Sequence, residues 1–123
     1  MLLEYELDDA CRRIHITARQ PFGLGDAVAI LERQAAAGAW GYGVLLDLRA
    51  GILSPEDQSA LLRYIEHLSA RHGRRGPVAL ISDDLATAQG YAWRSAHIGQ
   101  TAKVFRNAFQ AERWLNRQAH LRR

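Results

Sequence analysis

The sequence predicts an α/β domain in which an N-terminal β-hairpin is followed by alternating strands and helices, with a mostly parallel sheet and about four helices. Residues 3–7 and 13–17 alternate between apolar and polar side chains, as strands with one wet face do. Residues 44–46 form an apolar run that ends in charge at Asp47 and Arg49, which is typical of a central strand covered on both faces. From residue 40 onward, strand-like and helix-like segments alternate, which favours right-handed crossovers.

The first two strands and the first helix are delimited by turn and capping residues. Residues 8–10 carry turn chemistry between the two alternating segments, so we expect a tight hairpin there. A helix is predicted over residues 26–38, because apolar side chains recur at helical spacing from Ala27 through Leu31 to Ala35. Asp26 suits the positive start of this helix and Gly38 suits its end.

The second helix has the clearest start signal in the chain. Ser54 is a good N-cap, Pro55 fits the first helical position, and Glu56 and Asp57 place negative charge in the first turn. Its buried stripe is predicted at residues 61, 62, 65 and 68. The run of glycine, arginine and proline over residues 73–77 ends it.

Two more strand and helix pairs complete the predicted fold. A short apolar strand at residues 78–81 is followed by capping residues 82–84 and by a helix whose inner face is predicted at Leu85, Ala88, Ala92 and Ala96. Residues 101–105 predict the last strand. The final helix is expected to start near Asn107 and to bury Ala108, Ala111 and Leu115.

Length and composition predict one domain spanning residues 1–123. A chain of 123 residues can bury a single core, and 48% hydrophobic with 24% charged residues excludes intrinsic disorder. No segment approaches the roughly 20 apolar residues that span a membrane, so membrane insertion is not expected. Acidic residues stand near the start, where a secretory signal has basic ones, so we expect a cytoplasmic location. Cys11 is the only cysteine and is expected to be a small buried filler.

The charge pattern argues against nucleic acid as a partner. The net charge of +3 comes almost wholly from arginine, since Lys103 is the only lysine. The arginines come in separated pairs, and aromatic residues are not interleaved with them as in a nucleic-acid surface. The pairs are more simply interpreted as a solvated face.

Polar side chains that follow the predicted strands form a candidate binding edge. Carboxyl ends of parallel strands meet at one edge of the sheet, where ligands and partners usually bind. Capping of helix N-termini, together with a local ion pair between Asp47 and Arg49, would explain most of these residue types without a ligand. The candidate residues of this edge are Asp47, Arg49, Ser54, Asp57, Ser82, Asp83 and Arg106.

Three aromatic residues are candidates for an interface or an apolar ligand site. Trp40 lies in a glycine-rich turn before the central strand, and Tyr91 and Trp93 lie on the helix after Ser82. Exposed aromatic side chains there would indicate a partner or an apolar ligand. A place at the margin of the core is the competing interpretation.

No set of residues predicts catalysis, a metal site or a cofactor site. The five histidines include no pair at i, i+4 spacing, and the glycines at 23 and 25 lack the rest of a phosphate loop. The acidic pair at 8–9 with Asp47, Ser82 and Lys103 matches the residue types of a phosphoryl receiver. That interpretation requires a helix after the acidic pair, whereas a hairpin turn is predicted there. We therefore expect a protein that is not an enzyme.

The chain resembles the SpoIIAA-like group of STAS domains, which are small bacterial regulatory proteins. The resemblance rests on residues 44–49, the helix from Ser54, residues 78–84, residues 91–94, and residues 104–107 leading to 111–115. It implies a sheet with packed helices and a role in protein-protein regulation or in holding apolar ligands. The Asp-Ser-Ser-Gly run that carries the phosphorylated serine of true antagonists is absent, and its serine position falls near Asp57.

Two functional hypotheses follow from these observations. The first is a non-enzymatic STAS-like binding or regulatory module that acts on a protein partner or on a second copy of itself. The second is a carrier or sensor of a lipid or another apolar small molecule, held near the three aromatic residues.

Overall fold

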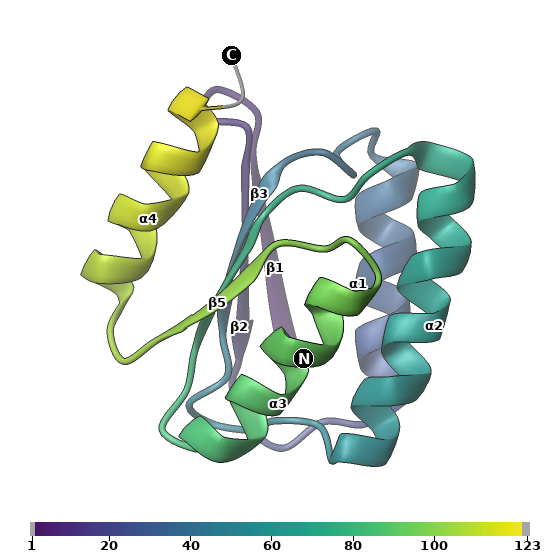
Figure 1. Ribbon diagram of the computed structural model, residues 1–123, viewed down its shortest axis with the longest axis vertical. Helices are drawn as coiled ribbons and strands as arrows, with labels where there is room; N and C mark the ends of the chain where they lie inside the picture. The colour runs from purple at the N-terminus through teal and green to yellow at the C-terminus, as the bar shows by residue number, and fades with distance from the viewer. Residues whose placement is uncertain (1, 122–123) are drawn as a thin grey trace.

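Five strands form one sheet, in the order β1-β2-β3-β4-β5, with helices on both of its faces (Figure 1). The computed structural model describes residues 2–121. The strands are β1 (Leu3–Asp8), β2 (Arg13–Ala18), β3 (Gly43–Asp47), β4 (Val78–Ile81) and β5 (Ala102–Phe105), and the helices are α1 (Leu24–Ala36), α2 (Pro55–His72), α3 (Leu85–His97) and α4 (Ala108–Leu121).

The predicted fold class is confirmed. The strands β1 and β2 pair antiparallel as the opening hairpin, and β2, β3, β4 and β5 pair in parallel. Each crossover moves one strand along the sheet in the same direction, so its helix falls on the same face. Helices α1, α2 and α3 therefore line one face side by side, whereas α4 covers β3, β4 and β5 from the other (Figure 1).

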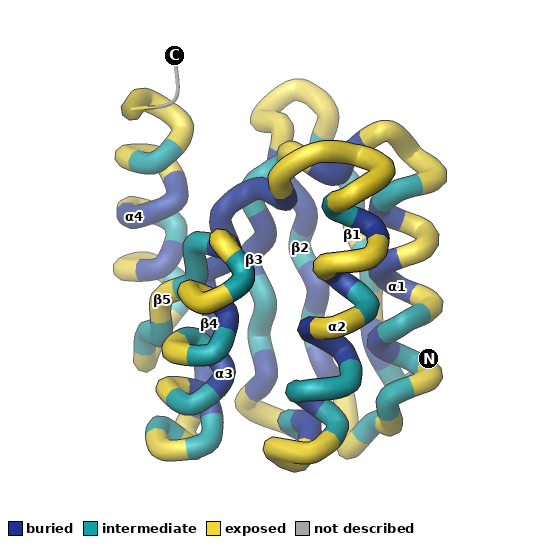
Figure 2. Tube along the Cα trace, turned by 45° about the vertical axis from the view of Figure 1, so that its right-hand side comes forward, coloured by how far each residue is buried: buried dark blue, intermediate teal, exposed yellow. Residues whose placement is uncertain are grey.

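Strand β3 is the central strand, as predicted, and separates two hydrophobic cores. Val44 and Leu46 point toward the layer of α1, α2 and α3, where the larger core lies. Leu45 points to the opposite face, where it packs with Trp114 and Leu115 of α4. Figure 2 shows buried residues along the inner sides of the helices and along the strands between them. Because successive side chains of a strand point to opposite faces of the sheet, β3 contributes residues to both cores.

The helix α3 is rotated relative to the prediction. Its buried residues are Ala88, Tyr91 and Ser95, whereas Ala96, predicted on the inner face, is exposed. Ala88 is buried as predicted, and Leu85 and Ala92 are half-buried. The prediction was wrong at Ala96, because small side chains at 92 and 96 would leave the inner layer underfilled, while Tyr91 reaches into it. Cys11 also differs from the prediction, because it lies exposed in the hairpin turn rather than buried.

Among the described residues, no helix has the length and apolar character needed to cross a membrane.

Candidate functional site

The carboxyl ends of β3, β4 and β5 lie together at one edge of the sheet. Asp47 pairs in register with Ile81, and Ile81 pairs with Phe105, so Ser82 and Arg106 directly follow the aligned strand ends. The expected juxtaposition of these segments is therefore present. The acidic pair at 8–9 lies at the opposite edge, because Asp8 pairs with Arg13 and Arg13 with Gly43, the first residue of β3. A receiver site is not assembled.

Asp47 and Arg49 form an ion pair with each other at this edge. The Arg49 guanidinium donates to both Asp47 carboxylate oxygens, with Nε to Oδ1 at 3.0 Å and Nη2 to Oδ2 at 2.6 Å. The Arg49 backbone N–H also donates to Oδ1, at 3.1 Å. The hydrogen bond from the Arg49 side chain lowers the pKa of Asp47, and the same contact raises the pKa of Arg49. The charges of Asp47 and Arg49 therefore compensate each other locally.

The serine hydroxyls of the edge make local hydrogen bonds, and Ser54 is the N-cap of α2. Ser54 Oγ accepts from the backbone N–H of Asp57 at 3.2 Å, which is the capping contact predicted for α2. Ser82 is buried, and its Oγ accepts from the backbone N–H of Asp84 at 3.1 Å. Both hydroxyls are therefore used inside the fold.

The remaining members of the edge are exposed or partly exposed. Asp83 and Arg106 are exposed and Asp57 is half-buried. The side-chain hydrogen bonds of the seven candidate residues, over the part of the chain that the structure describes, connect positions two or three residues apart. The polar edge therefore has the contacts of a capped sheet end and shows no assembled ligand site.

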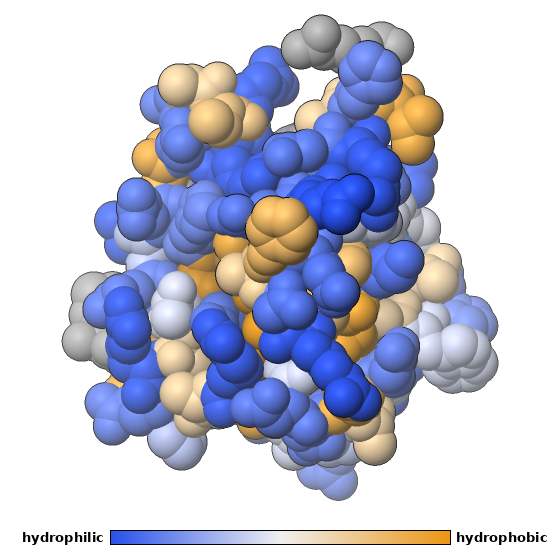
Figure 3. Space-filling model, turned by 90° about the vertical axis from the view of Figure 1, so that its left-hand side faces the viewer, coloured by the Kyte–Doolittle hydropathy of each residue, from blue (hydrophilic) through white to orange (hydrophobic). Residues whose placement is uncertain are grey.

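The three candidate aromatic residues do not share a surface. Trp40 is buried in the larger core and Tyr91 is 5% exposed, whereas Trp93 is 68% exposed and faces solvent. Trp93 contacts the His97 ring one turn later, with ring centroids 4.5 Å apart. Figure 3, which views the molecule from the α4 side, shows a largely hydrophilic surface with scattered apolar side chains. The three candidates therefore form no common cluster, and of the three only Tyr91 lines the cavity described next.

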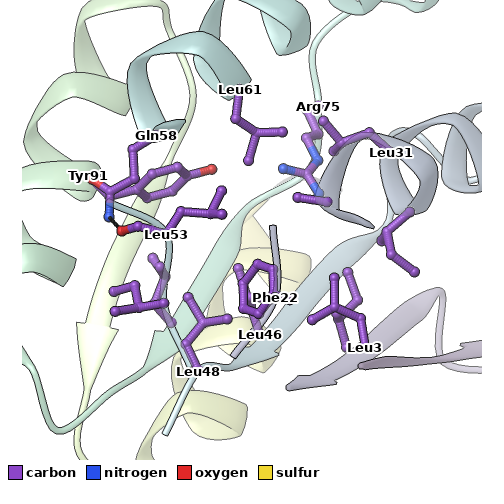
Figure 4. Close-up of a pocket in the computed structure, with 15 residues that line it drawn as sticks. Leu3, Phe22, Leu31, Leu46, Leu48, Leu53, Gln58, Leu61, Arg75 and Tyr91 are labelled. Carbon is purple, nitrogen blue, oxygen red and sulfur yellow. Dashed lines mark hydrogen bonds between the residues drawn. The ribbon is translucent and has the colours of Figure 1, made fainter. Parts of the chain in front are cut away.

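An apolar cavity of about 50 Å³ lies between the sheet and the layer of α1, α2 and α3 (Figure 4). Leu48, Ile52 and Leu53 contribute to its wall, so the loop after Asp47 enters the cavity through its apolar residues and not through its charged ones. Three of the lining residues are polar, namely Gln58, Arg75 and Tyr91. The others are Leu3, Ile16, Phe22, Ala27, Ile30, Leu31, Leu46, Leu48, Ile52, Leu53, Leu61 and Leu80.

Arg75 is the charged group of this cavity. Figure 4 shows its guanidinium between Leu31 and Leu61, with the nitrogen atoms directed into the space above Phe22 and Leu46. Arg75 is 5% exposed. It comes from the segment between α2 and β4, where glycines at 73 and 76 flank the two arginines. A charge thus lines a cavity whose wall is otherwise almost wholly hydrocarbon.

Neutral groups hold the Arg75 guanidinium. Nε and Nη2 donate to Gln34 Oε1 at 3.2 and 3.0 Å, and Nη1 donates to Gln100 Oε1 at 3.3 Å. Gln34 and Gln100 are fixed in turn, because Gln34 Nε2 donates to the Ala39 carbonyl at 3.0 Å and Gln100 Nε2 donates to Ser95 Oγ at 3.0 Å. The charge therefore sits at the centre of a buried amide network.

The network contains no counter-charge. The ion pairs among residues 2–121 join Glu4 to Arg19 and Asp47 to Arg49, and neither involves Arg75. Burial lowers the pKa of Arg75, an effect that the nearby Tyr91 oxygen partly offsets. A guanidinium nevertheless stays protonated in proteins. The Trp40 ring, whose centroid lies 5.4 Å from the guanidinium carbon, adds a cation-π contact.

Sequence reasoning missed this network. Arg75 was grouped with Arg74 as part of a solvated charge pair, but Arg74 is exposed and Arg75 is buried. Gln34 lies on the inner face of α1 with Ala27 and Leu31, but the predicted apolar positions of this helix do not include it. A glutamine inside an apolar stripe was the one available signal.

No protein-family model, curated protein or solved structure matches the chain. Within residues 2–121, no three His, Cys, Asp or Glu side chains gather in a way that could hold a metal ion. The interpretation of function therefore depends on the cavity and on the surfaces around it.

Proposed function

We propose that the chain is a non-enzymatic binding module that carries or senses a small apolar molecule in the cavity between the sheet and helices α1, α2 and α3. The observation that carries this proposal is the apolar cavity itself. Protein interiors are packed to the density of organic crystals, and voids larger than a water molecule are few. An apolar cavity inside a core is poorly suited to water and well suited to a small hydrocarbon group.

Two loops supply a route between solvent and the cavity. Phe22 and Ile52 line the cavity and are half-buried, and each lies in a loop without helix or strand structure. The loops touch at Gly51, where an added Cβ would lie 2.8 Å from Pro21 Cα. Loops open locally at lower free energy than packed helices and strands. A ligand would enter when these two loops separate.

Filling the cavity is expected to abolish binding of an apolar probe. The probe is 1-butanol, and the variant is Ala27→Leu, which adds three carbons at a buried lining position of α1. We expect the alcohol to raise the melting temperature of the wild-type protein and to leave that of Ala27→Leu unchanged, because a ligand stabilises only a state that binds it. Calorimetric titration gives the affinities directly.

The matched control is Ala35→Leu, which adds the same three carbons to the same helix at a half-buried position outside the cavity wall. This variant should keep the wild-type response. Equal responses of all three proteins, or no response of the wild-type protein, would refute binding in the cavity.

The exposed Trp93 favours a second candidate function. In this alternative the chain is a STAS-like regulatory module whose protein partner, in the simplest case a second copy of the chain, covers the outer side of α3. Trp93 is 68% exposed, and tryptophan is among the residues that contribute most to interface affinity. The exposed charges at Asp83 and Arg106 would belong to the polar rim of such an interface.

Replacement of Trp93 by serine is expected to weaken self-association about tenfold or more, as loss of an interface anchor does. Sedimentation velocity over a range of protein concentrations measures the dissociation constant. Phe109→Ser is the control, because Phe109 is equally exposed but lies on α4, at the opposite face of the sheet. A wild-type protein that stays monomeric at every concentration would exclude self-association.

A further inference from the structure

The cavity holds a positive charge whose counter-charge is missing. Arg75 is 5% exposed, and its hydrogen-bond partners among residues 2–121 are neutral, namely the amide oxygens of Gln34 and Gln100 and the Tyr91 side chain. Desolvating a charge costs several kcal/mol unless it is well paired. Neutral amides and the Trp40 ring offset only part of this cost, since charge-assisted hydrogen bonds to a carboxylate are about twice as strong as neutral ones.

The guanidinium retains donors for a further acceptor. Its five N–H groups make three hydrogen bonds to the two glutamines, the Tyr91 side chain is a further hydrogen-bond partner, and the guanidinium nitrogens are directed into the cavity (Figure 4). The Tyr91 hydroxyl, which also lines the cavity, accepts from Gln100 Nε2 at 3.3 Å. Its own O–H hydrogen is therefore available to a second acceptor. Donors from Arg75 and Tyr91 thus line the same cavity.

We infer that the ligand of this cavity is a monocarboxylate with a short apolar chain, held with its carboxylate against Arg75 and its chain among the leucines. The inference deepens the proposed function and rests on it. A carboxylate is the complement of a guanidinium, with which it makes charge-assisted hydrogen bonds. The leucines around Phe22 supply a hydrocarbon wall for the chain.

The size and charge of the cavity restrict the ligand further. Its volume of about 50 Å³ is a third of the roughly 150 Å³ of an engineered cavity that holds benzene. A carboxylate with one or two further carbons fits this space as it stands, whereas butyrate, which has as many non-hydrogen atoms as benzene, must displace Phe22 and Ile52. A phosphate carries close to two charges at neutral pH and would exceed the single charge of Arg75, so a carboxylate is the better match.

The test compares butyrate with 1-butanol, which have the same number of carbons but differ in charge. Isothermal titration of the wild-type protein at pH 7 should show butyrate binding about tenfold or more tighter than the alcohol, the increment that charge-assisted hydrogen bonds supply. As the pH falls and butyrate takes up a proton, its affinity should approach that of the alcohol. The affinity of the alcohol should not change with pH.

Variants at Arg75 assign the preference to this side chain. Arg75→Met should lower butyrate affinity about tenfold or more and change 1-butanol affinity less than about threefold, because the hydrocarbon wall remains. Arg75→Lys keeps the positive charge but lacks the planar guanidinium, so its butyrate affinity should lie between those of the wild-type protein and of Arg75→Met. Arg74→Met removes the exposed neighbour, whose side chain donates to Thr101, and should bind both probes like the wild-type protein.

The outcomes separate this inference from the proposed function. Equal wild-type affinities for acid and alcohol, or an acid preference that persists in Arg75→Met, would overturn the carboxylate inference and leave the cavity function standing. No binding of either probe would overturn both. Retained binding of 1-butanol by Arg75→Met shows that the variant is folded, and circular dichroism provides the same check if the alcohol does not bind.

Discussion

Replacement of Gly76 by alanine is expected to destabilise the protein by more than about 3 kcal/mol, above the usual cost of overpacking. A Cβ atom at this position would lie 2.1 Å from the Tyr42 carbonyl oxygen and 2.6 Å from that of Gly41. These are backbone atoms, so no side chain can turn away to relieve the clash. The Gly76 N–H also donates to the Trp40 carbonyl at 3.0 Å, which holds the two segments together.

Urea denaturation followed by circular dichroism measures this effect as a lower midpoint with an unchanged slope. Gly25→Ala is the control, because an added Cβ on α1 there meets nothing within 4 Å and alanine favours the helix. Its stability should stay within about 1 kcal/mol of the wild-type value. A Gly76→Ala protein as stable as Gly25→Ala would show that the approach of the two segments is not required.

The same close approach explains how Arg75 reaches the cavity. Gly76 brings the chain against residues 40–42, and the next residue but one, Val78, starts β4 in the middle of the sheet. Arg75 is therefore held at a fixed point beneath the helices α1 and α2. We expect Gly76→Ala to reduce butyrate affinity as well as stability.

Replacement of Gln34 by methionine is expected to lower the free energy of unfolding by about 3 kcal/mol. The variant keeps the length of the side chain but removes the oxygen that accepts from Arg75 Nε and Nη2, and the amide that donates to Ala39. A buried charge that loses its partner pays a desolvation penalty of this order. Thermal and urea unfolding measure the loss.

The double variant Gln34→Met with Arg75→Met is expected to be more stable than Gln34→Met alone, because it removes the charge together with its acceptor. Gln89→Met, at an exposed position of α3, should change stability by less than about 0.5 kcal/mol. A double variant less stable than either single variant would mean that the network is not organised around the Arg75 charge.

Local sequence patterns predicted most of the fold. Ser54 and Pro55 predicted the start of α2, and the structure contains the N-cap contact from Ser54 to the Asp57 N–H. The apolar run at 44–46 predicted the central strand. These features are recognisable because their causes lie within a few residues of each other. The position of Asp47, Ser82 and Arg106 at one edge followed from the same patterns, since carboxyl ends of parallel strands must meet.

The candidate site was predicted less well, because its contacts are remote in sequence. Arg75 binds Gln34 across 41 residues and Gln100 across 25. The rotation of α3 that places Tyr91 on the cavity also depends on volume that neighbouring elements leave unfilled. Trp40, expected in a turn at the core margin, is instead buried against Arg75.

The amino-acid sequence by itself determined the strands, the helices, the cap of α2 and the mostly parallel character of the sheet, because periodicity and capping act over one or two turns of chain. Only the tertiary structure decided that Arg75 is buried, where an apolar cavity remains, and that Arg75 lines this cavity. Those properties arise when three helices pack against the sheet, because that packing depends on contacts between residues that are far apart in the sequence.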